Sequence, residues 1–229
     1  MADKTNRELH PWTLDPDEAV RVQARLRGQL ILTWDGRQVN TIAGVDISLS
    51  GDKARAAVVV LRYPDLTPVE SAVAEAPLVF PYIPGLLAFR EGPAFLAAWE
   101  KLAGQADLVM FDGQGIAHPR GIGIAAQMGL WIGRPAIGVA KSRLYGQHVE
   151  LGPCAGDLAA LYDPHRPDLQ IGAVLRSKDR VKPLYISPGH LIDVPQAVQF
   201  VLGCLAGYRL PEPTRWAHKV AAGEALPGW

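Results

Sequence analysis

The sequence predicts an α/β protein in which helices cover both faces of a mixed β-sheet. Three β-rich segments follow one another in the first third of the chain, which is typical of antiparallel strands. In the middle of the chain a helical segment separates two short apolar segments, which is typical of a parallel βαβ unit. A sheet that combines both arrangements is mixed, and helices are expected to bury both of its faces.

The first half of the chain is expected to contain two helices and four strands. The first helix is predicted over residues 16–30, because Asp15, Asp17 and Glu18 place acidic charge at its start. The second helix follows the Pro- and Gly-rich segment 80–85. Its apolar side chains recur at helical spacing and share one face, namely Phe95, Leu96, Trp99 and Leu102. The expected strands cover residues 42–49, 54–62, 69–74 and 108–111.

The second half of the chain is expected to continue with alternating helices and strands. A helix over residues 119–130 leads to a strand over 136–140, which completes the βαβ unit with strand 108–111. Two further strands are predicted to form a hairpin, and two helices follow them. These four segments cover residues 171–175, 184–186, 195–208 and 213–222.

The composition indicates one cytoplasmic domain with a core of its own. The chain has 229 residues, of which 48% are hydrophobic, so it can bury a substantial core without disulfides. Its start lacks the apolar segment of a signal peptide, and no run of about 18 apolar residues could span a membrane. Cys154 and Cys204 show no C-x-x-C pattern and are expected to be reduced, buried thiols. We expect one domain over residues 1–229, with residues 1–40 packed on it as a helical extension.

Three carboxylates are placed where a metal site could form. Asp46 lies inside an apolar strand, where a charge requires a compensating partner. Asp112 closes the next apolar strand, and Glu91 lies near the start of the helix between them. Ligands of α/β sheets gather at strand ends, so the three side chains could meet there. Carboxylate oxygens suit Mg²⁺ or Mn²⁺, which assist phosphodiester cleavage by activating water and stabilising the leaving oxygen.

The spacing alone leaves other interpretations open. An Asp at the end of a strand also serves as a turn cap, and Glu91 could favour a helix N-terminus electrostatically. The pattern Gly44-x-Asp46-x-Ser48 also resembles the phosphate hairpin of actin-like sugar kinases. That fold needs a second such hairpin and a second lobe, for which 229 residues leave little room.

A glycine-rich segment, FDGQGIAHPRGIGIA over residues 111–125, follows a predicted strand and precedes a predicted helix. Its four glycines exceed what a core connection needs and would let a flat group lie against main-chain N–H and C=O groups. His118 and Arg120 add hydrogen-bond donors that suit a phosphate. The segment therefore indicates a binding loop.

This segment resembles a signature of the endonuclease V family, and four other segments resemble the family in the same order. They are AGVD at 43–46, PYIPGLLAFRE at 81–91, IGVAKSRL at 137–144 and PEPTRWAH at 211–218, with SPGH at 187–190 as a further similarity. The likeness covers residues 40–222 and shows no departure at the matched catalytic positions. It implies a ribonuclease H-like fold. It also implies hydrolysis of the second phosphodiester bond 3′ to deoxyinosine in DNA, leaving a 3′-hydroxyl and a 5′-phosphate.

The resemblance also implies roles for individual residues. Asp46 and Asp112 would hold Mg²⁺, for which Mn²⁺ could substitute, and Glu91 would complete the acidic cluster. His218 matches another metal-proximal position, although by itself it would be taken as a surface histidine. Lys141 would contact phosphate, although by itself it would be an ordinary solvated lysine.

Lesion recognition is assigned to a wedge, a pocket and a local basic patch. Tyr82, flanked by prolines, would be the wedge inserted at the lesion. The other residues expected to bind DNA or the altered base are Gly85, Leu87, Arg90, Gly113, His118, Gly123 and Ile124. Lys and Arg together number 23, as do Asp and Glu, so any polyanion must bind a local patch. Its candidate members are Arg90, Arg120, Arg143, Arg215 and Lys219.

The expected partner is DNA that contains deoxyinosine, and RNA that contains inosine is a second candidate substrate. No membrane association is expected. Two other functions remain open from the sequence: a catalytically inactive nucleic-acid binder with a ribonuclease H-like fold, and an actin-like phosphotransferase.

Overall fold

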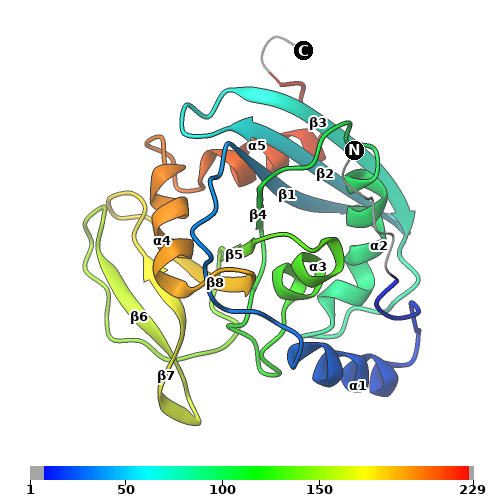
Figure 1. Cartoon of the computed structure of the whole chain (residues 1–229), viewed down its shortest axis with the longest axis horizontal. Helices are drawn as coiled ribbons and strands as arrows, with labels where there is room; N and C mark the ends of the chain where they lie inside the picture. Colours follow the sequence, from blue (N-terminus) through cyan, green and yellow to red (C-terminus); the bar gives the residue numbers. More distant parts are fainter. Residues whose placement is uncertain (1–7, 227–229) are drawn as a thin grey trace.

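A single mixed sheet organises the part of the chain that the computed structural model describes, residues 8–226 (Figure 1). Eight strands of these residues pair in the order β3-β2-β1-β4-β5-β8-β7-β6. The strands are β1 (Thr41–Ser50), β2 (Lys53–Arg62), β3 (Pro68–Pro77), β4 (Leu108–Phe111), β5 (Ala136–Ala140), β6 (Leu158–Asp163), β7 (Arg166–Leu175) and β8 (Leu184–His190). The helices are α1 (Pro16–Arg27), α2 (Leu87–Trp99), α3 (Ile124–Ile132), α4 (Val194–Gly203) and α5 (Glu212–Ala221).

The three N-terminal strands form the predicted antiparallel meander. β1 pairs with β2, and β2 pairs with β3, both antiparallel. β2 has the β-branched run that favours a strand, and its residues from Ala56 to Leu61 alternate between the two buried faces of the sheet. This prediction is confirmed, and the meander places β1 next to β4 in the middle of the sheet.

The predicted βαβ unit is also confirmed. β4 pairs in parallel with β1 on one side and with β5 on the other, and α3 connects β4 to β5. The predicted start of this helix at residue 119 is wrong, because α3 begins at Ile124. Gly121 has a φ of +66° and Gly123 has an extended backbone, so neither conformation continues a helix.

The C-terminal strands contain one element that the sequence did not predict. β7 and β8 form the predicted antiparallel hairpin, but β6 extends the sheet by one more strand. β6 reads LAALYD, whose Ala and Leu residues are not typical of strands. The first half of β7, residues 166–170, is exposed and polar, so only its buried half, residues 171–175, has the apolar signal of a strand.

Alternate residues of the central strands face opposite layers of helices. Val45 of β1 and Phe111 of β4 face the core formed with α2 and α3. Ile42 and Met110 face the other side, where α4 packs, while α5 covers β1 and β2. Figure 1 shows these helices around the sheet, so the predicted arrangement with helices on both faces is confirmed. In residues 8–226 no helix is both long and apolar enough to cross a membrane.

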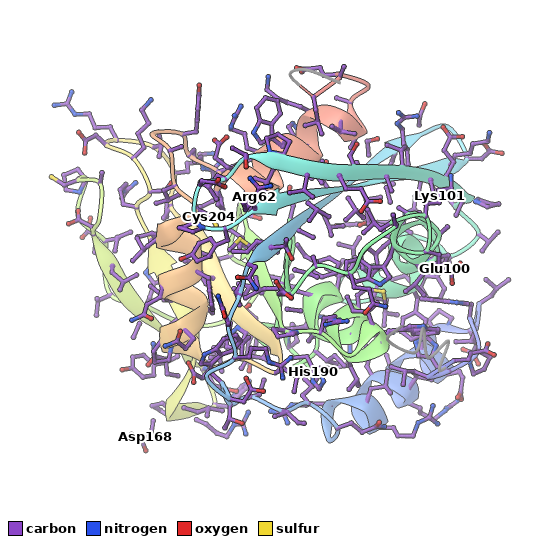
Figure 2. All side chains as sticks on the ribbon, turned by 45° about the horizontal axis from the view of Figure 1, so that its top comes forward. Arg62, Glu100, Lys101, Asp168, His190 and Cys204 are labelled. Atoms are coloured by element: carbon purple, nitrogen blue, oxygen red, sulfur yellow. The ribbon has the colours of Figure 1, made fainter. Side chains whose placement is uncertain are left out.

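The segment before β1 packs along one end of the molecule. The Asp15 side chain caps α1 by accepting a hydrogen bond from the Asp17 amide at 2.9 Å. After α1, the Leu191 amide donates to the Ile31 carbonyl at 2.6 Å, and the Ile31 amide donates to His190 Nδ1 at 3.3 Å (Figure 2). Residues 1–7 of the predicted 1–40 extension lie outside the described residues.

The two cysteines differ in exposure. Cys204 is buried at the end of α4 (Figure 2), whereas Cys154 is exposed. The prediction of a buried Cys154 is wrong, because this residue lies in the exposed segment 152–156 that precedes β6. Within residues 8–226 both thiols are free, as expected. α4 ends at Gly203, before the predicted end at residue 208.

Candidate active site

Asp46 and Asp112 lie beside each other on neighbouring parallel strands. The register of β1 and β4 pairs Val45 with Phe111, so the next residue of each strand reaches the same level. The Asp112 amide donates to the Val45 carbonyl at 3.1 Å and continues this pairing by one residue. The Asp46 side chain is buried, with 8% of the residue exposed. The sheet thus brings together the two aspartates that the sequence singled out.

Glu91 reaches the same place from α2. Leu87 and Glu91 are one helical turn apart on α2, and both line a cavity of about 160 Å³. Asp46 and Asp112 line the same cavity, which we call the carboxylate cavity. Its remaining walls come from Val45, Ile47, Phe111 and Ile124. Three carboxylates therefore share a small space whose other walls are mainly apolar.

Burial makes ionisation of Glu91 and Asp112 unfavourable. Burial raises the pKa of Glu91 to about 7, and the charges of Asp46 and Asp112 act in the same direction. Burial also raises the pKa of Asp112, although the hydrogen bond from Lys141 opposes this rise. The cavity thus concentrates negative charge that its own surroundings compensate incompletely.

Two basic side chains contact the aspartates. Lys141 follows β5, and its Nζ forms an ion pair with Asp112 and lies 4.0 Å from Asp46 Oδ1. His218 lies on α5, with Nδ1 3.2 Å from Asp46 Oδ2. α5 approaches β1 closely because Gly44 has no side chain, since a Cβ there would collide with the Pro213 carbonyl. Gly44 therefore allows α5 to bring His218 to Asp46.

The donor chemistry of the carboxylate cavity fits a divalent cation of the magnesium type. Asp46, Glu91 and Asp112 offer hard oxygen donors, and the pKa of Glu91 is raised by burial and by the charges of Asp46 and Asp112, which a bound cation would offset. Across the described residues 8–226, however, no group of three His, Cys, Asp or Glu side chains stands close enough to form a ready-made metal site. The cation now in contact with Asp112 is the Lys141 ammonium, so metal binding would require rearrangement of this ion pair.

A larger cavity of about 290 Å³ adjoins the carboxylate cavity and shares Leu87, Asp112 and Ile124 with it. We call it the lesion pocket, after the role that the sequence predicted for residues that line it. Seven of the residues that the sequence assigned to lesion recognition line it: Tyr82, Gly85, Leu87, Gly113, His118, Gly123 and Ile124. The Tyr82 side chain is 70% exposed, on the loop before α2. A flat apolar group in this pocket would lie next to Asp112.

The glycines of the 111–125 segment are needed mainly for contacts within the protein. A Cβ on Gly123 would collide with the carbonyl of Gln114, and a Cβ on Gly113 would press on a methyl group of Ile124. Neither glycine has a positive φ. Their lack of a side chain therefore allows close packing of the loop. The sequence instead predicted that it would leave room for a bound group against the main chain.

The remaining basic candidates are distributed around the site. Arg90 Nη1 donates to the Phe80 carbonyl at 2.8 Å, which turns the side chain toward the loop before α2. Arg143 is exposed in the segment after β5. Arg215 forms an ion pair with Glu212 at 2.6 Å, and its guanidinium lies 4.2 Å from the centre of the Tyr208 ring. Arg215 and Lys219 lie on α5 near His218, whereas Arg90 and Arg120 support the loop before α2.

Sequence reasoning missed two buried glutamines in the lesion pocket. Gln23 of α1 lines the pocket although it lies among the buried Ala19, Val22 and Leu26, and a polar residue on an apolar helix face was a usable signal. Gln114 Nε2 donates to the Ser142 carbonyl at 3.0 Å, while its Oε1 has no hydrogen-bond partner among the described residues. Ile83, Pro84, Ala88, Ala140, Ser142 and Leu144 also line the pocket.

Proteins of one known family match this chain over most of its length. Residues 24–219 match the family model described as Endonuclease V. An endonuclease V of Alkalilimnicola ehrlichii is 50% identical over 224 residues, which are 96% of this chain and 97% of that protein.

Solved structures are similar over nearly the same span. The endonuclease V structure of Streptomyces avermitilis has a TM-score of 0.85 and 38% identity, with 92% of this chain and 93% of that chain covered. An endonuclease V of Ciona intestinalis, in complex with a 24mer DNA containing an inosine followed by a ribo-adenosine, has a TM-score of 0.78 and 25% identity. There 90% of this chain and 95% of that chain are covered. The shared fold is ribonuclease H-like, as the sequence predicted.

Proposed function

Because this chain belongs to the endonuclease V family, we propose that it is a metal-dependent endonuclease that cuts DNA beside deoxyinosine. The observation that carries the proposal is that two cavities adjoin each other. A pocket with room for a base and a cavity lined by three carboxylates share Asp112, Leu87 and Ile124. A base held in the first would bring its own strand close to the acidic groups in the second. The Ciona intestinalis relative in complex with inosine-containing DNA supports the same substrate class.

The cleaved bond would be the second phosphodiester 3′ to the lesion, with a 3′-hydroxyl and a 5′-phosphate as products. This position rests on the five ordered motifs that resemble the family. RNA that contains inosine is a second candidate substrate.

Asp46, Asp112 and Glu91 would hold Mg²⁺ or Mn²⁺ through their carboxylate oxygens. A divalent ion, when bound, supplies an activated water and stabilises the charge on the leaving oxygen. Lys141 would exchange its contact with Asp112 for a contact with substrate phosphate, which neutralises charge beside the reacting bond. His218 orients Asp46 through the contact between Nδ1 and Oδ2.

Recognition of the base would use main-chain groups. Hypoxanthine has an acceptor at O6 and a donor at N1, whereas adenine has a donor and an acceptor at these positions. A pocket that pairs with the first pattern leaves its own polar groups unpaired with the second, which gives strong discrimination. The main-chain groups of Leu87, Gly113 and Ile124 are the candidates, while the Gly85 carbonyl already accepts hydrogen bonds from three side chains. Tyr82 would fill the gap that the displaced base leaves in the duplex.

Matched oligonucleotides test this proposal. We expect nicking of inosine-containing DNA in Mg²⁺ or Mn²⁺, no nicking in EDTA, and no nicking of the same sequence with adenine. The inosine-containing RNA counterpart, assayed in parallel, tells which nucleic acid is preferred. Tight binding of inosine DNA without nicking in any divalent metal would favour the inactive binder, and turnover of ATP would favour the phosphotransferase.

We also propose that residues 1–40 are part of one domain with the rest of the chain and that the protein acts in the cytoplasm. The contacts of α1 and of Ile31 with the body of the protein support the first proposal. Limited proteolysis tests it, because residues 28–40 are largely exposed and open to cleavage, and α1 should stay bound to the rest of the chain after such a cut if both belong to one domain. Fractionation of cells that express the chain tests the second proposal.

A further inference from the structure

One carbonyl group fixes the end of the loop that presents Tyr82. The Gly85 oxygen accepts hydrogen bonds from Gln23 Nε2 at 3.0 Å, from His118 Nε2 at 3.0 Å and from Arg120 Nη2 at 2.6 Å. Gln23 comes from α1, and the other two donors come from the loop between β4 and α3. Tyr82 is three residues before this carbonyl. Three segments that are distant in the sequence therefore meet at the base of the exposed wedge.

The three donors are also connected to one another. Arg120 Nε donates to Gln23 Oε1 at 2.5 Å, and the Arg120 amide donates to His118 Nδ1 at 3.1 Å. Burial lowers the pKa of His118 to about 4, so its ring is neutral near pH 7. Because Nδ1 accepts a hydrogen bond, the ring proton is on Nε2, where it can be donated to the Gly85 carbonyl. We call Gln23, His118, Arg120 and the Gly85 carbonyl the loop clamp.

Gln23 is the member of the loop clamp whose presence most needs an explanation. It is only 1% exposed, on the face of α1 that buries Ala19, Val22 and Leu26. An apolar residue could pack there without the cost of removing an amide from water. The Gln23 amide instead uses both ends, since Nε2 donates to Gly85 and Oε1 accepts from Arg120. The range that matches the family model, residues 24–219, does not include Gln23.

We propose that Gln23 is a positioning residue for lesion recognition, which acts through the loop clamp to hold the Tyr82 loop over the lesion pocket. The inference rests on the proposed function, and it gives α1 a role in that function. A loop that is already held in place loses less conformational freedom when DNA binds, so the clamp favours binding of the substrate. The carboxylate cavity contains none of the clamp residues, so the chemical step should not depend on Gln23.

The test compares Gln23→Leu with a matched control. Gln23→Leu has nearly the same size and removes all three hydrogen bonds of the amide, including a longer one from Nε2 to the Ile122 carbonyl at 3.4 Å. Gln29→Leu makes the same change at an exposed position just after α1. We expect Gln23→Leu to weaken the Kd for inosine-containing duplex DNA about tenfold, as loss of a buried hydrogen-bond network would. We expect kcat at saturating substrate and Mg²⁺ to change less than about twofold, because the loop clamp contributes to substrate binding and not to the chemical step. Gln29→Leu should bind and cleave like the unchanged protein.

A double-mutant cycle with Tyr82→Ala separates positioning from general stability. If Gln23 acts through the Tyr82 loop, Gln23→Leu should add little to the loss of duplex binding that Tyr82→Ala already causes. Fully additive losses, or a loss of kcat with unchanged Kd, would overturn the inference. Should Gln23→Leu fold poorly, Gln23→Glu keeps the acceptor for Arg120 and removes the donor to Gly85, and the same cycle applies to it.

Hydrogen exchange of residues 80–86 provides a readout that needs no substrate. The amides of this loop should exchange faster in Gln23→Leu than in the unchanged protein or in Gln29→Leu. Unchanged exchange would refute the loop clamp. Failure of the unchanged protein to nick or bind inosine DNA would instead refute the proposed function, and the exchange result would still tell whether Gln23 holds the loop.

Discussion

Asp46, Asp112 and Glu91 share one cavity but have different neighbours. Asp46 contacts His218 and lies near Lys141, and Asp112 forms an ion pair with Lys141. Glu91 lies on α2 beside apolar walls, and burial raises its pKa to about 7. At the scale of residues, the aspartates are thus the better compensated anions, and Glu91 is the one that most needs a cation.

Replacement of Asp46 by Asn should remove the chemistry and keep the fold. Asn has nearly the same shape but lacks the charge that a divalent cation requires, so we expect nicking to fall by at least about a thousandfold. Binding of inosine DNA should change far less, because Asp46 does not line the lesion pocket. Nicking rates in Mg²⁺ and binding without metal check this. Near-normal nicking by Asp46→Asn would rule out its role as a metal ligand.

Tyr82→Ala should affect binding to duplex DNA more than the cleavage step. The exposed ring can fill the gap in a base stack, which offsets part of the cost of displacing a base. We expect duplex affinity to fall by about tenfold and single-stranded affinity to fall less, since no duplex gap forms there. Affinities for both substrates, measured with the same inosine-containing strand, provide the comparison. Equal losses would make Tyr82 a general stacking residue.

Residues of the candidate site could be predicted from the sequence only where their place in a predicted strand or helix was itself unusual. Asp46 was visible because a charge inside an apolar strand requires a compensating partner, and Asp112 because it closes the next apolar strand, where ligands of α/β sheets gather. Gln23 was not, because its partner Gly85 is 62 residues away and only the folded chain brings them together. The orientation of Arg90 toward Phe80 likewise depends on tertiary contacts.

At the scale of elements, the connection from β4 to α3 determines the shape of the lesion pocket. Its backbone runs from Asp112 to Gly123 before a helix can begin. The sequence predicted the start of this helix at residue 119, which is too early, because Gly121 and Gly123 adopt conformations that delay it. The strands of the meander were easier to predict, since their β-branched residues and turns are local signals.

Two glycines of this connection offer a matched test. Gly123→Ala should lower the free energy of unfolding by roughly 1 to 3 kcal/mol, because its Cβ would meet the rigid Gln114 carbonyl. Gly113→Ala should cost less, because its Cβ would meet only the Ile124 side chain, which can shift. Urea unfolding of both variants measures the difference. Equal stability losses would mean that the main chain near Gln114 yields as readily as a side chain.

At the scale of the whole molecule, the sheet order brings the site together. β1, β4 and β5 are adjacent and parallel, so Asp46, Asp112 and Lys141 emerge at the same edge of the sheet. The meeting of these side chains could be predicted from the sequence, because the βαβ pattern indicates parallel strands and ligands of α/β sheets gather at strand ends. The pairing of β6 could not, because a short strand rich in Ala and Leu has no distinct signal.

The contribution of Glu91 to the stability of the metal-free protein should fall as pH rises toward neutrality, whereas the buried His118 and His190, whose pKa values are lowered to about 4, contribute in the opposite direction. The pKa of Glu91 is raised from an ordinary value of 4.5 to about 7, so the folded state binds this proton more tightly than the unfolded state does. The contribution of Glu91 to the free energy of unfolding is therefore largest below about pH 4.5, and it is lost as the pH rises from 4.5 to 7. The loss is at most roughly 3 kcal/mol.

Melting temperatures at pH 5 and pH 8, measured in EDTA, check this dependence. Glu91→Gln removes only the Glu91 contribution, so its melting temperature at pH 8 relative to that at pH 5 should be higher than in the unchanged protein, while the contributions of Asp112 and of the buried histidines remain in both proteins. An equal pH dependence in Glu91→Gln and the unchanged protein would contradict the prediction.

The loop clamp has a consequence for α1 that follows from thermodynamic reciprocity. If docking of α1 favours the loop position that binds DNA, then bound DNA must favour docked α1 by the same free energy. Local opening of α1 would break the hydrogen bonds of Gln23 to Gly85 and Arg120 and so weaken the hold on the Tyr82 loop. The N-terminal helix and the lesion pocket would then form one cooperative unit, in which the order of a peripheral helix depends on whether a damaged base is bound.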